Sequence, residues 1–340
     1  MAKVVTFGEI MLRLSPPGYS RLVQAEHLEV TYGGGEANVA VSIANYGGDV
    51  AFVTKVPANP LGQAAINHLR RFGVDTRYIL RGGERLGIYF LEHGASQRPS
   101  KVVYDRKGSS ISQVQPGEFN WEEIFKGAQW FHFTGITPAL GDNVAAVTLE
   151  AVQVAKKLGL MVSCDLNYRK NLWSPAKAQE TMTKLIQYVD IAIGNEEDAE
   201  KVFGIKAEAS DVTTGQLSEE GYRQVAFELA RRFNLKMVAI TLRESYSAFD
   251  NGWSALLYDG KEFHRSRRYQ IHIVDRVGGG DAFAGALIYA LMEGFQVKDA
   301  LEFAVAASCL KHTIPGDFNH VTREEVMTLM QGDASGRVQR

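Results

Sequence analysis

The sequence predicts an α/β protein with a mostly parallel central sheet and helices on both faces, and three observations lead to this fold class. Strand-like and helix-like segments alternate along most of the 340 residues, as they do when crossover helices join parallel strands. Hydrophobic residues make up 45% of the chain, enough for a large core, yet no apolar run approaches the length of a transmembrane helix. Two segments break the alternation and predict a second, smaller sheet.

Apolar runs rich in β-branched residues predict the strands, and apolar residues spaced three and four apart predict the helices. In chain order, the predicted strands cover residues 4–10, 50–56, 130–134, 161–166, 191–194 and 237–242. The predicted helices cover residues 37–46, 61–72, 144–158, 176–188, 219–233 and 282 to about 292. Gly47 and Gly159 follow two of these helices directly, which supports their C-terminal ends.

The two segments that break the alternation are predicted to form strands of an inserted sheet. Residues 11–31 have no helical period, and residues 87–106 contain two β-rich runs separated by a polar, proline-containing loop. We expect this sheet to cover about 11–32 and 86–107 and to act as a lid that excludes water from a cleft, with a surface hairpin as the alternative. One domain over residues 1–330 and a flexible tail over 331–340 complete the predicted organisation.

A run of glycines before an acid carries the strongest functional signal. Gly278-Gly279-Gly280-Asp281 opens the apolar helix predicted over 282–292. Glycines let successive backbone N–H groups converge, and a helix N-terminus adds a positive field, so the turn suits a phosphate or a developing negative charge. Asp281 would repel a bound anion, so its sensible role is to accept a proton from a group that attacks a phosphate. The alternative is a flexible turn in which Asp281 caps the helix.

Composition and net charge limit the classes of binding partner that we expect. The net charge of −2 gives no reason to expect nucleic acid or anionic lipid. Met1-Ala2-Lys3 leads straight into the first strand without a signal peptide, and we expect a cytoplasmic protein without a membrane partner. Cys164 and Cys309 lie among apolar residues outside any metal-ligand spacing, which predicts buried free thiols.

Three motifs in order point to a family. Gly33-Gly34-Gly35-Glu36-Ala37-Asn38 precedes a predicted helix, Asn195-Glu196-Glu197-Asp198 follows a predicted strand, and the Gly-Gly-Gly-Asp site comes last. With these motifs the chain resembles the ribokinase-like (PfkB-type) carbohydrate kinases over nearly its whole length, from Gly8 to Thr322. Further segments are similar to the 2-keto-3-deoxygluconate kinases within that family: residues 104–109, 134–140, 165–169, 172–173 and 312–317.

The resemblance implies a fold, an activity and cofactors. The fold would be ribokinase-like, and the activity would be ATP-dependent phosphorylation of 2-keto-3-deoxygluconate to 2-keto-3-deoxy-6-phosphogluconate with Mg²⁺. A monovalent cation and a homo-oligomer formed through the lid are both compatible with the resemblance. A kinase of a neutral sugar such as fructose or ribose, or of a nucleoside, is the alternative within the family.

The resemblance also assigns catalytic and substrate-binding residues. Asp281 would accept the sugar hydroxyl proton, while the amides of Gly278, Gly279 and Gly280 would stabilise charge on the transferred phosphoryl group. A carboxylate on the substrate would explain two arginines, since a guanidinium binds it bidentately. The alternatives are aromatic packing for the two tyrosines, surface charges for the arginines and a turn role for Asp317. Besides Asp281, the expected substrate-binding residues are Gly34, Tyr89, Tyr104, Arg106, Arg169 and Asp317.

ATP and Mg²⁺ would bind beside these residues. Asn195 and Asp198 match the motif that organises water around Mg²⁺, and a helix N-cap is the compatible alternative for Asn195. The chain departs from the family pattern at three positions. Glu244 and its neighbours stand where glycines are usual, Gly279 stands in place of Ala, and Asp198 stands in place of a longer Glu. The expected nucleotide-binding residues are Asn167, Arg169, Asn195, Thr241, Arg243, Ser245, Gly278 and Gly280.

Functions of other classes fit the sequence less well. A dinucleotide-dependent oxidoreductase would carry a Gly-x-Gly-x-x-Gly fingerprint after the first strand, and the chain has none there. A catalytically inactive sugar sensor would have no need of Asp281. A protein-binding scaffold would leave the glycine clusters unexplained.

Overall fold

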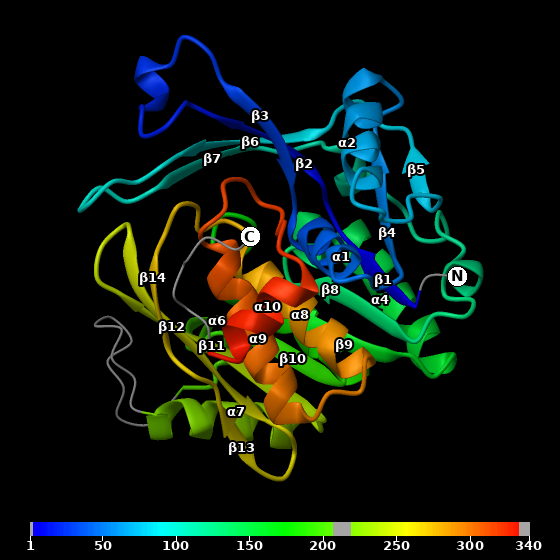
Figure 1. Cartoon of the computed structure of the whole chain (residues 1–340). Helices are drawn as coiled ribbons and strands as arrows, with labels where there is room; N and C mark the ends of the chain where they lie inside the picture. The colour runs from blue at the N-terminus through cyan, green and yellow to red at the C-terminus, as the bar shows by residue number, and fades with distance from the viewer. Residues whose placement is uncertain (1–2, 207–218, 333–340) are drawn as a thin grey trace.

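The computed structural model describes residues 3–206 and 219–332, and two sheets of different size dominate it (Figure 1). The large sheet has ten strands and the small sheet has four. The strands of the large sheet are β1 (Val4–Phe7), β4 (Val50–Val56), β5 (Ile79–Arg81), β8 (Trp130–Thr134), β9 (Met161–Asp165), β10 (Ile191–Gly194), β11 (Met237–Ser245), β12 (Asp250–Tyr258), β13 (Phe263–Arg265) and β14 (Tyr269–His272).

The large sheet is parallel over most of its width, as the sequence predicts. Its order is β13-β12-β11-β10-β9-β8-β1-β4-β5, with β14 also paired to β12. All neighbours from β11 to β5 are parallel, whereas β12 pairs antiparallel with β11, β13 and β14. Parallel strands end at the same edge, so the loops that follow β9, β10 and β11 lie next to one another.

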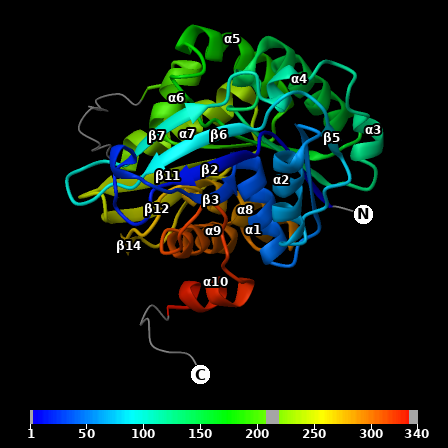
Figure 2. The same cartoon turned by 90° about the horizontal axis from the view of Figure 1, so that it is seen from above.

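Helices cover both faces of this sheet (Figure 2) and enclose two hydrophobic cores. One core is closed by α1 (Gly35–Asn45), α2 (Pro60–Arg70), α8 (Gly279–Met292), α9 (Val297–Lys311) and α10 (Arg323–Met330). The other is closed by α3 (Trp121–Ile124), α4 (Asp142–Lys157), α5 (Pro175–Leu185), α6 (Glu196–Phe203) and α7 (Glu219–Phe233). The predicted α/β class with helices on both faces is confirmed.

The small sheet is built from the two segments that break the alternation in the sequence. Its order is β3-β2-β6-β7, and Figure 1 shows β6 and β7 as a long hairpin that extends above the large sheet. The predicted separate sheet is therefore confirmed, whereas its action as a lid stays a prediction. Its strands are β2 (Met11–Ser15), β3 (Glu29–Gly33), β6 (Gly87–Glu92) and β7 (Lys101–Asp105).

The first predicted strand, residues 4–10, is wrong beyond Phe7. The chain leaves the large sheet at Gly8 and enters the small sheet as β2. A Cβ at Gly8 would stand 2.1 Å from a carboxylate oxygen of the buried Glu36, so only glycine fits at this crossing. Ile10 is also buried, so the apolar pattern of the sequence continues past the end of β1 at Phe7. The pattern therefore gives no sign that the strand ends there.

Other differences concern boundaries and segments without a prediction. The helix predicted from residue 282 begins at Gly279, and the one predicted from 37 begins at Gly35. The sequence analysis assigned no element to the antiparallel edge strands β12, β13 and β14 or to α9 and α10. Cys164 and Cys309 are buried free thiols, as predicted. Within residues 3–206 and 219–332 no helix is long and apolar enough to span a membrane, and residues 333–340 of the predicted tail lie outside the described residues.

The crossing at Gly8 generates a prediction about stability. In Gly8→Ala the added methyl group should displace the Glu36 carboxylate, which accepts hydrogen bonds from Thr134 N (2.8 Å) and Thr137 Oγ1 (2.6 Å). We expect the free energy of unfolding to fall by about 1–3 kcal/mol, measured by urea denaturation. Gly280→Ala is the matched control, because no heavy atom lies within 4 Å of a Cβ there and its stability should not fall. Equal denaturation midpoints for both variants would show that Glu36 moves aside without cost.

Candidate active site

A large cleft lies between the small sheet and the carboxyl ends of the parallel strands. Its volume is about 2310 Å³. Pockets for one small ligand have roughly 300–1,000 Å³, so this cleft has room for two substrates side by side. Strands β6 and β7 line one side of the cleft, and the residues that follow β9 and β10, the end of β11 and the start of α8 line the other.

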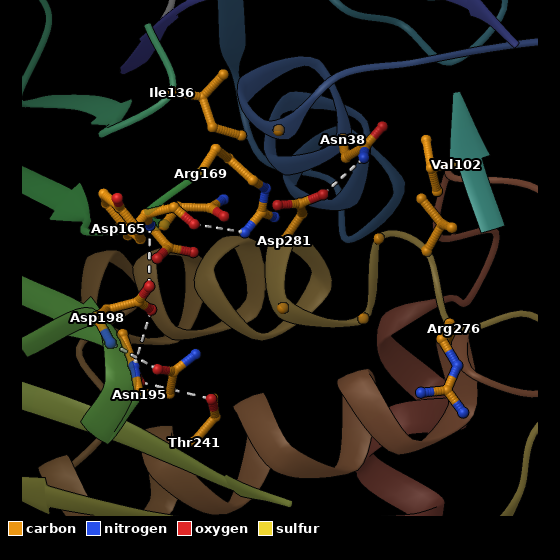
Figure 3. Close-up of a pocket in the computed structure, with 18 of the residues that line it drawn as sticks. Asn38, Val102, Ile136, Asp165, Arg169, Asn195, Asp198, Thr241, Arg276 and Asp281 are labelled. Atoms are coloured by element: carbon orange, nitrogen blue, oxygen red, sulfur yellow. Dashed lines mark hydrogen bonds between the residues drawn. The ribbon is translucent and has the colours of Figure 1, made fainter. Parts of the chain in front are cut away.

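Every residue that the sequence analysis assigned to a site lines this cleft, and Figure 3 shows several of them pointing toward its interior. The residues come from segments up to several hundred positions apart in the sequence, so the fold brings the whole predicted set together. They are Gly34, Tyr89, Tyr104, Arg106, Asn167, Arg169, Asn195, Asp198, Thr241, Arg243, Ser245, Gly278, Gly279, Gly280, Asp281 and Asp317.

The three glycines before Asp281 differ in backbone conformation and in the space around each Cα. Gly278 has a φ of +82° and lies where a Cβ would be 2.1 Å from the Asp317 carbonyl oxygen. A Cβ at Gly279 would be 2.3 Å from the His312 ring, whereas nothing lies within 4 Å of one at Gly280. The first two glycines are thus fixed by packing, and the third is open to the cleft. We call residues 278–280 the anion turn, since the first N–H groups of a helix have no intrahelical partner and favour an anion.

Asp281 lies in the first turn of α8 and does not cap the helix, because the N-cap is Gly278. The alternative role of Asp281 as an N-cap is therefore wrong. Its Oδ2 accepts a hydrogen bond of 2.6 Å from Asn38 Nδ2 (Figure 3). Burial raises the pKa of Asp281 to about 6, and the Asn38 bond opposes this rise. The carboxylate is ionised at neutral pH yet poised to take up a proton, which suits a general base.

A cluster of acids lies beside Asp281 at the ends of β9 and β10. Burial, followed by the charges of Asp198 and Asp281, raises the pKa of Asp165 well above its usual range, and Arg169 opposes this rise. Asn195 caps α6 by accepting from Asp198 N at 2.8 Å, so its predicted N-cap role is confirmed. Burial also raises the pKa of Asp198 to about 6. These buried carboxylates beside Arg169 offer oxygen ligands of the kind that a divalent cation prefers.

Asp317 is part of a buried ionic network on the small-sheet side. It accepts from Arg13 Nη1 at 2.8 Å and from the Tyr89 hydroxyl at 2.5 Å. Arg13 Nη2 donates to Asp275 Oδ2 at 2.6 Å. Asp317 therefore anchors the small sheet to the anion turn, which is more than the turn role considered as its alternative. Tyr89 and Tyr104 are opposite one another in β6 and β7 with ring centroids 5.9 Å apart, and both reach the cleft.

The two arginines expected to bind a carboxylate have different surroundings. Arg106 forms an ion pair with Glu9, and its side chain is only 9% exposed. Only its Nη2 donates to Glu9, and its Nε is buried without a hydrogen-bond partner, so this pairing leaves guanidinium donors unused. Arg169 is exposed and donates to the Tyr168 carbonyl at 3.2 Å, and its charge acts on the acids around Asp165. Arg106 is thus a buried cleft residue rather than an ordinary surface charge.

The departure at Glu244 is compensated within the structure. Arg268 binds the Glu244 carboxylate with two hydrogen bonds of 2.9 and 2.8 Å, and this pairing lowers the pKa of Glu244 to about 2. The negative charge is neutralised locally instead of facing a phosphate. Arg276 lines the same end of the cleft, and burial together with the charge of Arg243 lowers its pKa. Two guanidinium groups close enough to repel each other suit a polyphosphate.

Sequence reasoning missed several residues of the site. Asn38 had a usable signal, because it belongs to the second glycine cluster one helical turn after Gly34. Glu9 and Arg13 had none, since their partners are distant in the sequence. A Cβ at position 34 would lie 1.9 Å from the Glu9 carbonyl oxygen. Close backbone packing therefore requires glycine at this position whether or not a sugar binds.

Comparisons with known proteins agree with this geometry. The profile of the pfkB family carbohydrate kinases matches residues 1–321. The chain belongs to this family. The predicted carbohydrate kinase is thereby confirmed at the level of the family, which excludes the oxidoreductase and scaffold alternatives.

Individual relatives cover almost the whole chain. A 2-dehydro-3-deoxygalactonokinase from Haloferax volcanii is 34% identical over 98% of this chain and 98% of its own. The crystal structure of 2-dehydro-3-deoxygluconokinase from Thermotoga maritima is 56% identical, with a TM-score of 0.94 over 98% of this chain and 100% of that chain. An Escherichia coli protein described as ribokinase II, solved with ATP and Mg²⁺, shares the fold at 22% identity, with a TM-score of 0.81 over 97% and 99% of the chains. The predicted ribokinase-like fold is confirmed.

Asp281 generates the first prediction about activity. Asp281→Asn keeps the size of the side chain but cannot accept a proton, so we expect turnover to fall by about 10²–10⁴-fold. The affinities for sugar and ATP should change far less, as measured by isothermal titration. Asp299→Asn, an exposed change on α9, should leave turnover unchanged. Near-wild-type turnover of the Asp281→Asn variant would show that Asp281 is not the general base.

The hydrogen bond from Asn38 generates a prediction about pH. The ionised base is lost as the pH falls through its pKa of about 6, so kcat/KM should decline below that pH. The Asn38 bond lowers this pKa, so Asn38→Ala should move the acid limb of the pH profile to higher pH. Asn67→Ala, which removes an exposed amide on α2, should leave the limb in place. A limb that does not move in Asn38→Ala would belong to another acid such as Asp198, whose pKa is also about 6.

Proposed function

We propose that this carbohydrate kinase transfers the γ-phosphoryl group of ATP to the 6-hydroxyl of 2-keto-3-deoxygluconate, giving 2-keto-3-deoxy-6-phosphogluconate. The observation that carries the choice of a sugar acid is Arg106, a largely buried guanidinium that lines the cleft and has N–H donors beyond the one paired with Glu9. A neutral sugar has no group that needs such a donor, whereas the carboxylate of a sugar acid does. The names of the Thermotoga and Haloferax relatives support the same choice.

In the proposed reaction Asp281 takes the proton of the sugar hydroxyl as its oxygen attacks the γ-phosphorus. The bond between that phosphorus and the β,γ-bridging oxygen breaks, and ADP leaves with the electron pair. Backbone N–H groups of the anion turn, residues 278–280, stabilise the charge on the phosphoryl oxygens. The bond from Asn38 aims the Asp281 carboxylate and keeps it ionised before the sugar binds.

The sugar acid is proposed to lie beneath the small sheet. Arg106 would bind its carboxylate, with Glu9 holding the guanidinium in place and the Tyr104 ring 5.2 Å from its centre. Arg169 approaches from the end of β9 and is the second candidate for the acid. The small sheet would cover the substrate as a lid and exclude water from the reacting phosphate.

ATP is proposed to occupy the end of the cleft near β11. Arg243 and Arg276 would bind its phosphates, with Thr241 and Ser245 beside them and Asn167 at the end of β9. Asn195 and Asp198 would hold Mg²⁺ through water, and Asp165 lies close enough to contribute. Mg²⁺ held there would supply positive charge against the phosphates of ATP. The Escherichia coli relative, which binds ATP and Mg²⁺, supports this assignment.

A second candidate substrate is the galacto epimer of the same sugar acid. The Haloferax relative is named for that epimer, and the two acids differ at one carbon. A carboxylate site at Arg106 would serve both equally well. The higher identity to the Thermotoga enzyme favours the gluco epimer.

The homo-oligomer, the monovalent cation and the cell compartment stay predictions. Exposed apolar residues on β7, Val102 (39% exposed), Val103 (52%) and Tyr104 (41%), support a homo-oligomer that pairs through the small sheet. A cytoplasmic location and the lack of a nucleic-acid partner stay expectations from the sequence.

The test of the proposed function is ATP turnover over a panel of sugars combined with Arg106→Ala. Wild-type enzyme should prefer 2-keto-3-deoxygluconate to fructose and ribose. A charge-assisted hydrogen bond contributes about 1.5–3 kcal/mol, so KM for the acid should rise by about one to two orders of magnitude in Arg106→Ala. A neutral ketose should be affected much less.

Controls separate recognition of the acid from support of the lid. Arg106→Lys should recover only part of the loss, because an ammonium lacks the planar fork. Arg77→Ala removes an exposed arginine paired with Asp75 and should leave both substrates unaffected. An equal loss for acidic and neutral sugars would assign Arg106 to the structure of the lid. A wild-type preference for fructose or ribose would overturn the sugar-acid assignment.

A further inference from the structure

Lys311, the last residue of α9, is completely buried, and carbonyl oxygens surround its charge. Its Nζ donates to the carbonyls of Gly316 at 2.6 Å and of Asp275 and Ile314 at 3.3 Å each. An ammonium has three N–H donors, so these main-chain oxygens use all of them. In the described part of the chain no carboxylate forms a salt bridge with Lys311, because Asp275 and Asp317 pair with Arg13 instead.

The three carbonyls belong to the two loops that shape the anion turn. Asp275 lies directly before the turn, and its side chain accepts from Val277 N at 3.0 Å and Gly316 N at 3.0 Å. Ile314 and Gly316 lie in the loop that leads from α9 to Asp317, whose carbonyl packs against Gly278. The Lys311 ammonium therefore joins both loops.

Burial of a lysine charge is unfavourable unless the surroundings compensate it. Burial lowers the pKa of Lys311, and the charges of Asp275 and Asp317 oppose this effect. Rings of main-chain carbonyls around one positive charge are what proteins offer to a dehydrated monovalent cation. The ammonium of Lys311 is in just such surroundings, but it is covalently attached to the chain.

We propose that Lys311 is a built-in monovalent cation that holds the anion turn in position, so that this kinase needs no added potassium or sodium ion. The inference rests on the proposed phosphoryl transfer at residues 278–281 and assigns Lys311 as a positioning residue. Its charge also favours the ionised form of Asp281, together with Asn38 and Arg169 and against burial. The Lys311 side chain thus supplies the positive charge that a monovalent cation from solution would otherwise supply.

The first test uses the unaltered enzyme. Turnover is measured at fixed ionic strength in tetramethylammonium chloride, a cation too large for such a site, and then with potassium, sodium or ammonium chloride. We expect the same turnover in all four salts. Strong activation by potassium or sodium would overturn the inference while leaving the kinase function intact. Failure to phosphorylate any sugar in any salt would instead contradict the proposed function.

The second test replaces the lysine. Lys311→Ala should leave a carbonyl-lined space and displace the turn, and such a displacement costs about 10²-fold in turnover. Potassium or ammonium should restore part of this loss, and the same ions should raise Tm of the variant, because they bind only the folded state. Lys311→Met fills the space without charge and should not respond to either ion. Lys298→Ala, an exposed change on α9, is the matched control.

The rise in Tm needs no substrate, so it tests the site even if the sugar is wrongly assigned. Lys311→Ala that is fully active in tetramethylammonium would overturn the inference, and so would a folded Lys311→Ala whose turnover and Tm ignore every ion. If neither variant folds, the salt series on the unaltered enzyme still decides between a built-in and an external cation.

Discussion

The structure of the site depends on one buried ionic network between the small sheet and the anion turn. Arg13 on β2 bridges Asp275 and Asp317 at 2.6 and 2.8 Å, and the side chains of all three residues are 3% exposed or less. Removal of one partner from such a network leaves an uncompensated buried charge, which costs about 3–5 kcal/mol. The network therefore links the small sheet to the turn before α8 and to the loop after α9.

This constraint helps to explain how one helix end holds both the Asp281 carboxylate and a turn that favours anions. The turn is held open by packing of Gly278 against Asp317 and of Gly279 against His312, and its N–H groups favour negative charge. Asp281 lies one residue further along the same helix, where burial raises its pKa while Asn38 restrains the rise. The charges of Arg169 and Lys311 add to that restraint. The result is a carboxylate that is ionised near neutral pH beside a site for phosphate.

Local patterns in the sequence predicted much of this arrangement, and long-range contacts account for what they missed. Glycine clusters, strand ends and the Asn195 cap are encoded within a few residues, and the resemblance to a known family supplied most of the other cleft residues. The break at Gly8 was hidden because Ile10 is as buried as the strand before it. Lys311 reads in sequence as an ordinary cation at a helix C-terminus, and only the fold surrounds it with carbonyls. Arg13 gives no signal of this network, since its two acidic partners lie more than 260 positions away.

The central claim is that sugar and nucleotide meet in one cleft at Asp281 and the anion turn. A crystal structure with 2-keto-3-deoxygluconate, Mg²⁺, ADP and aluminium fluoride tests it most directly, because the fluoride complex mimics the phosphoryl group in transfer. The account predicts the fluoride complex at the amides of residues 278–280, with the sugar 6-oxygen about 2.6–3.2 Å from the Asp281 carboxylate. A fluoride complex bound away from α8, or a sugar whose 6-oxygen faces another residue, would contradict it.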